Sequence, residues 1–197
     1  LVLNQNKNNQ FSYYSNLEEQ KEVFEIRKAG LNILMSMKGD KKPVAFIEDC
    51  AVSLDHLADY TAQLKEIFKK YNTSGMFYAH ASVGTLHIRP VLNMKSDEDI
   101  KNMRSISEES FEIVKNYKGS HSGEHGDGIV RSEFHEMMFG KKIVNAFEEI
   151  KDTFDSKNLL NPGKIVRPFK SNDRDLMRYK TGYQAQNIRT HYDWSTW

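Results

Sequence analysis

Two apolar segments joined by a short turn limit the fold more than any other feature of this chain. Residues 76–80 and 86–92 are rich in apolar and aromatic side chains, and the connection between them contains Gly84. So short a connection favours an antiparallel hairpin, because a parallel pair needs a crossover of about a dozen residues. The turn at Gly84 can also bring the rings of His80 and His87 together near one end of this hairpin.

Hydrophobic periodicity predicts the other elements. Helices are expected at residues 17–37, 57–71, 97–118, 132–139 and 143–154. The helix at 17–37 is apolar almost all round in its second half, which we therefore expect to be buried. The short apolar stretch 44–52 predicts a further strand. Strands that are close in sequence, with helices between them, favour an α+β fold with a mainly antiparallel sheet over a doubly wound parallel one.

The composition of the chain excludes several kinds of partner and binding site. The chain has 28 basic and 27 acidic residues, a net charge of +1, and so no electrostatic signature of nucleic-acid binding. Its one cysteine, Cys50, excludes a disulfide framework or a cysteine-rich metal site within these 197 residues. This composition fits a reducing compartment, so we expect a cytoplasmic protein, at most peripheral to a membrane in its full-length form. No segment approaches the roughly 20 apolar residues of a membrane span.

A glycine-rich segment adds chemistry to the hairpin histidines. Glu124 and His125 lie between Gly123 and Gly126, where there is little side-chain packing to account for them. Together with the two hairpin histidines they offer three nitrogen ligands and one oxygen ligand. Such a set suits a borderline divalent ion such as Zn²⁺, and three protein ligands leave one position open for substrate.

Other histidines are weaker candidates. His121 lies just before the glycine-bounded pair and is an alternative ligand. His56, His135 and His191 are predicted to be surface or capping residues.

Two arginines are candidates for holding a carboxylate. Arg27 lies in the apolar half of the first helix, and Arg89 shares a strand face with the second hairpin histidine. A buried guanidinium needs a partner, which could be a substrate carboxylate or the side chain of Glu48 or Asp49.

Three motifs, taken in order, resemble a known family. They are residues 122–131 (SGEHGDGIVR), 138–140 (MFG) and 154–165 (FDSKNLLNPGKI). They resemble the C-terminal domain of the FAD-linked oxidases, which include D-lactate dehydrogenases, the flavin subunit of glycolate oxidase and D-2-hydroxyglutarate dehydrogenase. The resemblance covers roughly residues 17–168, after an irregular segment at 1–16, and it implies a ferredoxin-like α+β substrate or cap domain.

The resemblance also implies an activity and roles for the site residues. The chain would be the substrate-binding part of an enzyme that oxidises a D-2-hydroxy acid, with hydride passing to FAD on a separate N-terminal domain. By similarity to metal-dependent members, His80, His87 and Glu124 would hold a divalent metal, with Zn²⁺ expected. His125 would be the base, and Arg27 would meet the substrate carboxylate.

Further assignments follow from the same resemblance. Asn161 and Lys164 would lie towards the flavin. Residues 169–197 resemble the connector that large members have before a C-terminal iron–sulfur module, so we expect a piece of such a polypeptide. A substrate-contacting lysine of some members falls on Ile47, and Arg89 would compensate as a second substrate contact.

The match departs from the family at the turn between the histidines. The Gly-Asp-Gly-Asn that family members have at this turn is replaced by residues 82–85 (SVGT), which keep only Gly84.

Two other function classes stay open. One is a non-catalytic cap or assembly module whose histidines are packing residues. The other is a zinc hydrolase, which is disfavoured because the sequence has no His-Glu-x-x-His helix.

Overall fold

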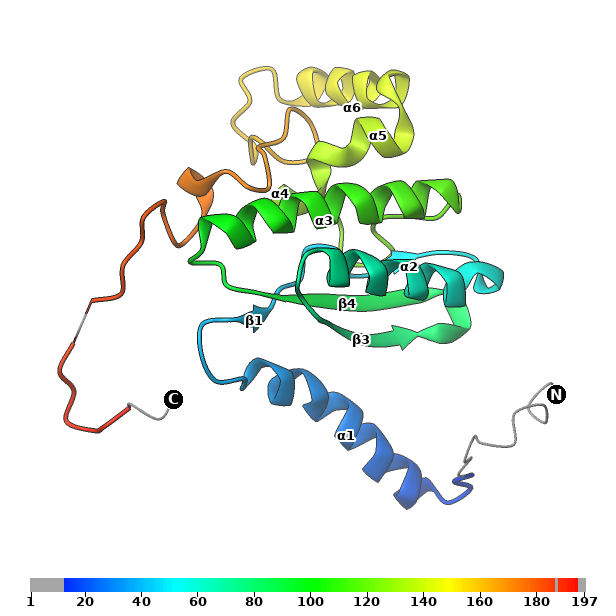
Figure 1. The fold of residues 1–197 in the computed structure, drawn as a ribbon. Helices are drawn as coiled ribbons and strands as arrows, with labels where there is room; N and C mark the ends of the chain where they lie inside the picture. Colours follow the sequence, from blue (N-terminus) through cyan, green and yellow to red (C-terminus); the bar gives the residue numbers. More distant parts are fainter. Residues whose placement is uncertain (1–12, 187, 195–197) are drawn as a thin grey trace. The chain divides into compact units, whose positions relative to one another are not determined.

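The structure, a computed structural model, describes residues 13–186 and 188–194 and divides the chain into two units, residues 1–37 and 38–197 (Figure 1). The first unit contains helix α1 (Leu17–Met35), which begins after Asn16, whose side chain accepts a hydrogen bond from the Glu18 backbone N–H. Most of the predicted irregular segment 1–16 lies outside the described residues.

Helix α1 does not have the buried half expected from its sequence. None of its residues is buried, and Arg27 is exposed. The physical reason is that the described part of this unit contains a single helix, which offers no second element of its own against which the apolar side chains could pack.

The second unit is built on the predicted hairpin. Strands β3 (Gly75–His80) and β4 (Thr85–Leu92) pair antiparallel, with His80 opposite Thr85 and Tyr78 opposite His87. β4 is central, because the short strands β1 (Lys42–Pro43) and β2 (Cys50–Ala51) pair with its two ends, both antiparallel. The predicted mixture of helices with an antiparallel sheet is confirmed.

Helices α2 (Leu57–Lys70) and α3 (Asp97–Asn116) lie together over one face of β3 and β4 (Figure 1). Their apolar sides and the sheet form the core, whose fully buried members include Tyr60, Leu64, Ile88, Ile106 and Phe111. α3 begins at Asp97, directly after the predicted cap Ser96, whose hydroxyl accepts the Asp99 N–H at 3.3 Å.

Beyond α3 lie shorter elements and an irregular tail. The helices are α4 (Gly128–Arg131), α5 (His135–Phe139) and α6 (Lys141–Phe154). Short 3₁₀ turns occur before α3, at Leu54–His56 and Ala81–Val83, and after it, at Ser132–Phe134 and Arg174–Leu176. The predicted helix 132–139 is thus a 3₁₀ turn followed by α5. In the part of the chain that is described, no helix combines the length and apolar character needed to cross a membrane.

The strand predicted at 44–52 is largely wrong. Of its residues, only Cys50 and Ala51 lie in a strand, which pairs with β4, and the chain turns at Asp49, which has a φ of +58°. Phe46 and Ile47 are buried without belonging to a strand. Their apolar character reflects burial in the core, and a short apolar run cannot by itself distinguish burial from strand pairing.

Gly84 closes the hairpin in the left-handed region, and its replacement should destabilise the fold. Its φ is +73°, and a Cβ at this position would lie 1.9 Å from the Val52 carbonyl oxygen. Gly84→Ala therefore combines an unfavourable backbone conformation with a steric overlap, and we expect a loss of more than about 2 kcal/mol in urea unfolding. Gly126→Ala is the control, because its φ is +76° but its Cβ would meet open space. Equal losses in the two variants would contradict this account.

Asp155 holds the turn after α6 that leads to Asn161. Its carboxylate accepts the backbone N–H groups of Leu159 at 2.9 Å and Leu160 at 2.8 Å, and it pairs with Lys151. The Lys151 ammonium and these N–H groups lower the pKa of Asp155 to about 2.

This lowered pKa predicts an acid-sensitive turn. The stability that Asp155 contributes should be complete above its ordinary pKa of about 3.9 and should be lost as the pH falls through the folded-state value. Asp155→Asn should remove that part of the pH dependence. NMR titration of the Asp155 carboxyl carbon tests this directly, and an ordinary midpoint would refute it.

Candidate functional site

The hairpin and the glycine-rich loop at residues 119–127 bring His80, His87 and Glu124 together. Glu124 Oε1 lies 3.6 Å from His80 Nε2 and 2.9 Å from His87 Nε2. Ligand atoms around a tetrahedral zinc ion, with bonds of about 2.0–2.1 Å, lie about 3.3 Å apart. The spacing of the three side chains therefore matches a metal-ligand set, and their donor types suit a borderline divalent cation.

His125 lies beside these three residues on the same loop. Its ring centroid is 5.3 Å from that of His87, and its Nε2 is 3.9 Å from Glu124 Oε1. Its side chain is 48% exposed, whereas that of His87 is 4% exposed. An accessible imidazole beside a possible metal site can reach a small bound molecule, which is what proton transfer requires.

His87 is buried between Tyr78 and a second carboxylate. The Tyr78 ring stacks on the imidazole at a centroid distance of 4.5 Å, and His87 Nδ1 faces Glu48 Oε1 at 3.3 Å. Burial lowers the pKa of His87 below its ordinary value, so the ring is neutral at neutral pH. A neutral imidazole with a carboxylate behind it is a recurrent arrangement in metal sites.

Glu48, His87 and His125 make a competing set of ligand atoms that also lie within 4.8 Å of one another. The Glu48 carboxylate, however, already accepts hydrogen bonds from Arg89 Nη2 at 2.8 Å and from the Tyr78 hydroxyl at 3.1 Å. In the described part of the chain the ion pairs of Glu124 are all with histidines. The set that contains Glu124 is therefore the better one for a cation.

The other predicted site residues do not belong to this cluster. Arg89 lies near the histidines but pairs with Glu48, one of the protein carboxylates considered from the sequence. Arg27 lies on α1, in the first unit. Asn161 and Lys164 line an apolar pocket together with α6 side chains, and none of the four clustered residues contributes to its wall.

The glycine-rich loop is held by Asp49, a residue that sequence reasoning considered only as a partner for an arginine. Asp49 is 0% exposed, and its Oδ2 accepts the backbone N–H groups of Glu124 at 2.7 Å and His125 at 2.8 Å. These bonds lower the pKa of the Asp49 carboxyl against the opposing effect of its burial. The sequence offers one signal for this role of Asp49: two acidic residues, at 48 and 49, interrupt an otherwise apolar stretch.

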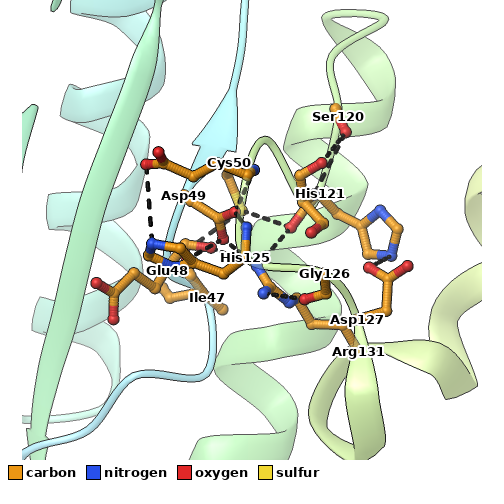
Figure 2. Close-up of polar contacts among 12 residues, drawn as sticks. Ile47, Glu48, Asp49, Cys50, Ser120, His121, His125, Gly126, Asp127 and Arg131 are labelled. Carbon is orange, nitrogen blue, oxygen red and sulfur yellow. Dashed lines mark hydrogen bonds and ion pairs between the residues drawn. The ribbon is translucent and has the colours of Figure 1, made fainter. Parts of the chain in front are cut away.

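Arg131 completes this support from below the loop (Figure 2). Its guanidinium pairs with Asp49 Oδ1 and donates to the backbone carbonyl oxygens of Glu48 at 2.6 Å and of Gly126. The buried pair thereby joins the turn at residues 46–49 to the loop segment that carries the site.

In the structure, the surroundings of His121 and His135 differ from those predicted from the sequence. His121 is buried and faces Asp127, not the cluster around Glu124. His135 is also buried, so its prediction as a surface or capping residue is wrong. The reason is that Asp127 and the Ile165 carbonyl oxygen supply polar partners inside the protein, at 2.9 and 3.1 Å from its ring nitrogens.

Comparison with known proteins gives a consistent family match. Residues 2–165 match the model of the family described as FAD linked oxidases, C-terminal domain. A D-2-hydroxyglutarate dehydrogenase of Pantoea ananatis is 37% identical over 149 residues, which are 76% of this chain and 14% of that protein.

More distant relatives carry other names. The glycolate oxidase subunit GlcD of Bacillus subtilis is 29% identical, over 75% of this chain and 31% of its own length. A mitochondrial D-lactate dehydrogenase [cytochrome] of Arabidopsis thaliana is 25% identical, over 85% of this chain and 29% of its own length. The chain therefore spans under a third of the length of these curated relatives.

The buried Asp49–Arg131 pair predicts a large effect of a conservative change. Asp49→Asn leaves Arg131 buried without its counter-charge, and we expect a loss of about 3–5 kcal/mol in urea unfolding. Adding Arg131→Met to the same chain should recover part of that loss, because no buried charge then remains unpaired. Strictly additive losses would show that the two side chains do not act as a pair.

Proposed function

Because the chain belongs to the C-terminal domain family of the FAD-linked oxidases, we propose that it is the substrate- and metal-binding part of a flavin-dependent enzyme. The enzyme would oxidise a D-2-hydroxy acid of the lactate, glycolate or 2-hydroxyglutarate type to the 2-oxo acid. An N-terminal FAD-binding domain and a C-terminal iron–sulfur module of the same polypeptide would flank this part. Its sheet and helices would form a ferredoxin-like cap domain, in a protein of the cytoplasm.

The observation that carries this proposal is the convergence of His80, His87 and Glu124 beside an exposed His125. The first three would hold a divalent cation, with Zn²⁺ the expected ion, and the buried His87 is already neutral and directed at Glu124. A cation bound there would lower the pKa of a coordinated substrate hydroxyl group.

His125 would accept the hydroxyl proton. Its ring is accessible and lies next to Glu124, so a hydroxyl group near the three ligands falls within its reach. Imidazole is the side chain best suited to this transfer because it titrates near neutral pH. Hydride acceptance from the α-carbon is the chemistry that the flavin supplies when bound.

The substrate carboxylate needs a cationic partner. Arg89 is paired with Glu48 at 2.8 Å, so it is better suited to holding the wall of the site than to binding the acid. By the family resemblance, the carboxylate contact would fall first to Arg27, with Arg89 as a second contact. Asn161 and Lys164 would face the flavin from the pocket beside α6.

Metal content tests the ligand set. The purified chain should take up Zn²⁺, and His80→Ala and Glu124→Gln should each lose one ion per chain, measured by elemental analysis after dialysis. Glu48→Gln is the comparison variant and should keep that ion, although more weakly bound, because Glu48 supports His87 and pairs with Arg89 without being one of the three ligands. Loss in Glu48→Gln with retention in Glu124→Gln would overturn the ligand set. A chain free of metal even after reconstitution would favour the non-catalytic cap module.

Activity tests the base. In the full-length enzyme, His125→Asn should keep its metal while oxidation of D-lactate, glycolate or D-2-hydroxyglutarate falls by about 10²- to 10⁴-fold. His56→Asn serves as the control, because His56 stacks on Tyr117 at a centroid distance of 4.7 Å and has no role in the proposal. Unchanged turnover in His125→Asn would remove His125 from the chemistry.

A further inference from the structure

A second group of ligand atoms lies apart from the proposed site. His121, Asp127 and His135 present ring nitrogens and carboxylate oxygens within 4.8 Å of one another. Asp127 Oδ1 is 3.4 Å from His121 Nε2, and Asp127 Oδ2 is 2.9 Å from His135 Nε2. Figure 2 shows the His121 ring turned towards the Asp127 carboxylate. The carboxylate therefore lies between two imidazoles and directs one oxygen at each.

Both ring nitrogens of His135 face acceptor oxygens. Its Nδ1 lies 3.1 Å from the Ile165 carbonyl oxygen, and its Nε2 lies 2.9 Å from Asp127 Oδ2. A neutral imidazole carries only one N–H, so it can donate to only one of these two oxygens. The other nitrogen then directs its lone pair at an oxygen, which is unfavourable unless the ring is doubly protonated or a cation joins the two atoms.

The ring of His121 lies beside Asp127 without a hydrogen bond to it. It is 1% exposed, and neither of its ring nitrogens has a hydrogen-bond partner among the described residues. Asp127 Oδ1, which faces it, lacks one as well. A neutral imidazole has one lone pair to offer to a cation, and His121 directs Nε2 at Asp127 Oδ1. The rings of Phe111 and Phe139 lie against it and provide no polar partner.

We propose that His121, Asp127 and His135 bind a second divalent cation, of the zinc class. One ion would contact the unpaired His121 nitrogen, the Asp127 carboxylate and the His135 nitrogen that faces this carboxylate. The observed separations of 3.4 and 2.9 Å bracket the value of about 3.3 Å that tetrahedral zinc requires. The Ile165 carbonyl oxygen behind His135 is the outer contact that metal-binding imidazoles commonly make. Two imidazoles disfavour Mg²⁺ and Ca²⁺.

The position of this second site suggests its role. His121 and Asp127 lie on either side of Glu124 and His125 in the sequence, and His135 begins α5. An ion bound here would tie both sides of this loop segment to α5. The second site is thus a positioning element for the loop, and its existence does not depend on the proposed activity.

Zn²⁺ titration of the purified chain by calorimetry, with elemental analysis, tests the second site. The unmodified chain should bind two ions. Glu124→Gln, which removes the first site, should still bind one, and adding Asp127→Asn should weaken that remaining binding by at least about 100-fold. Asp127→Asn preserves the size of the side chain, and His135→Asn is a second variant in case it fails to fold. Mg²⁺ in place of Zn²⁺ should not bind at this site.

The outcomes separate the second site from the first. If folded Glu124→Gln binds no Zn²⁺, the second site is refuted while the proposed function stands. If Asp127→Asn alone removes every ion, the second site stands and the first metal set fails. Nitrogen-15 NMR adds a check that does not depend on counting ions. With excess Zn²⁺, His135 protonated on both ring nitrogens would show a simple ion pair with Asp127 and would overturn the proposal.

Discussion

The buried ion pair between Asp49 and Arg131 is the interaction on which the candidate site depends. The glycine-rich loop has no regular secondary structure, so its backbone groups need partners from elsewhere in the chain. Asp49 supplies them, because its carboxylate binds the N–H groups of Glu124 and His125 while its own carbonyl oxygen accepts the Gly123 N–H at 2.9 Å. Without this support the loop would not be held within the sub-ångström tolerance that catalysis demands.

The strand β2 joins that loop to the hairpin. Cys50 and Ala51 pair with β4, and Ala51 also exchanges two backbone hydrogen bonds with Ser120, each 2.9 Å long. The backbones approach so closely that a Cβ on Gly119 would lie 2.3 Å from the Ala51 carbonyl oxygen, and one on Gly123 would lie 2.7 Å from that of Asp49. Glycine is therefore required where the two segments meet, and this contact brings residues from distant parts of the sequence into one site.

The sequence correctly predicted those parts of the structure that depend on local sequence patterns. Periodicity located the hairpin and the main helices, and the polar residues between glycines indicated Glu124 and His125. What sequence missed depends on distant partners. Asp49 and Arg131 are separated by 82 positions, and no local pattern links them. Burial of His135 likewise depends on Asp127 and on the Ile165 carbonyl oxygen, so a lone histidine on a short helix gave no sign of it.

The central claim is that the hairpin and the loop together form a metal site built on His80, His87 and Glu124. Anomalous diffraction at the zinc edge, from crystals of this chain grown with Zn²⁺, tests it most directly because it locates the ion rather than counting it. The account predicts a peak bonded to one nitrogen of each histidine and to a Glu124 oxygen. A peak coordinated by Glu48 and His125 in their place, or no peak beside His87, would contradict it.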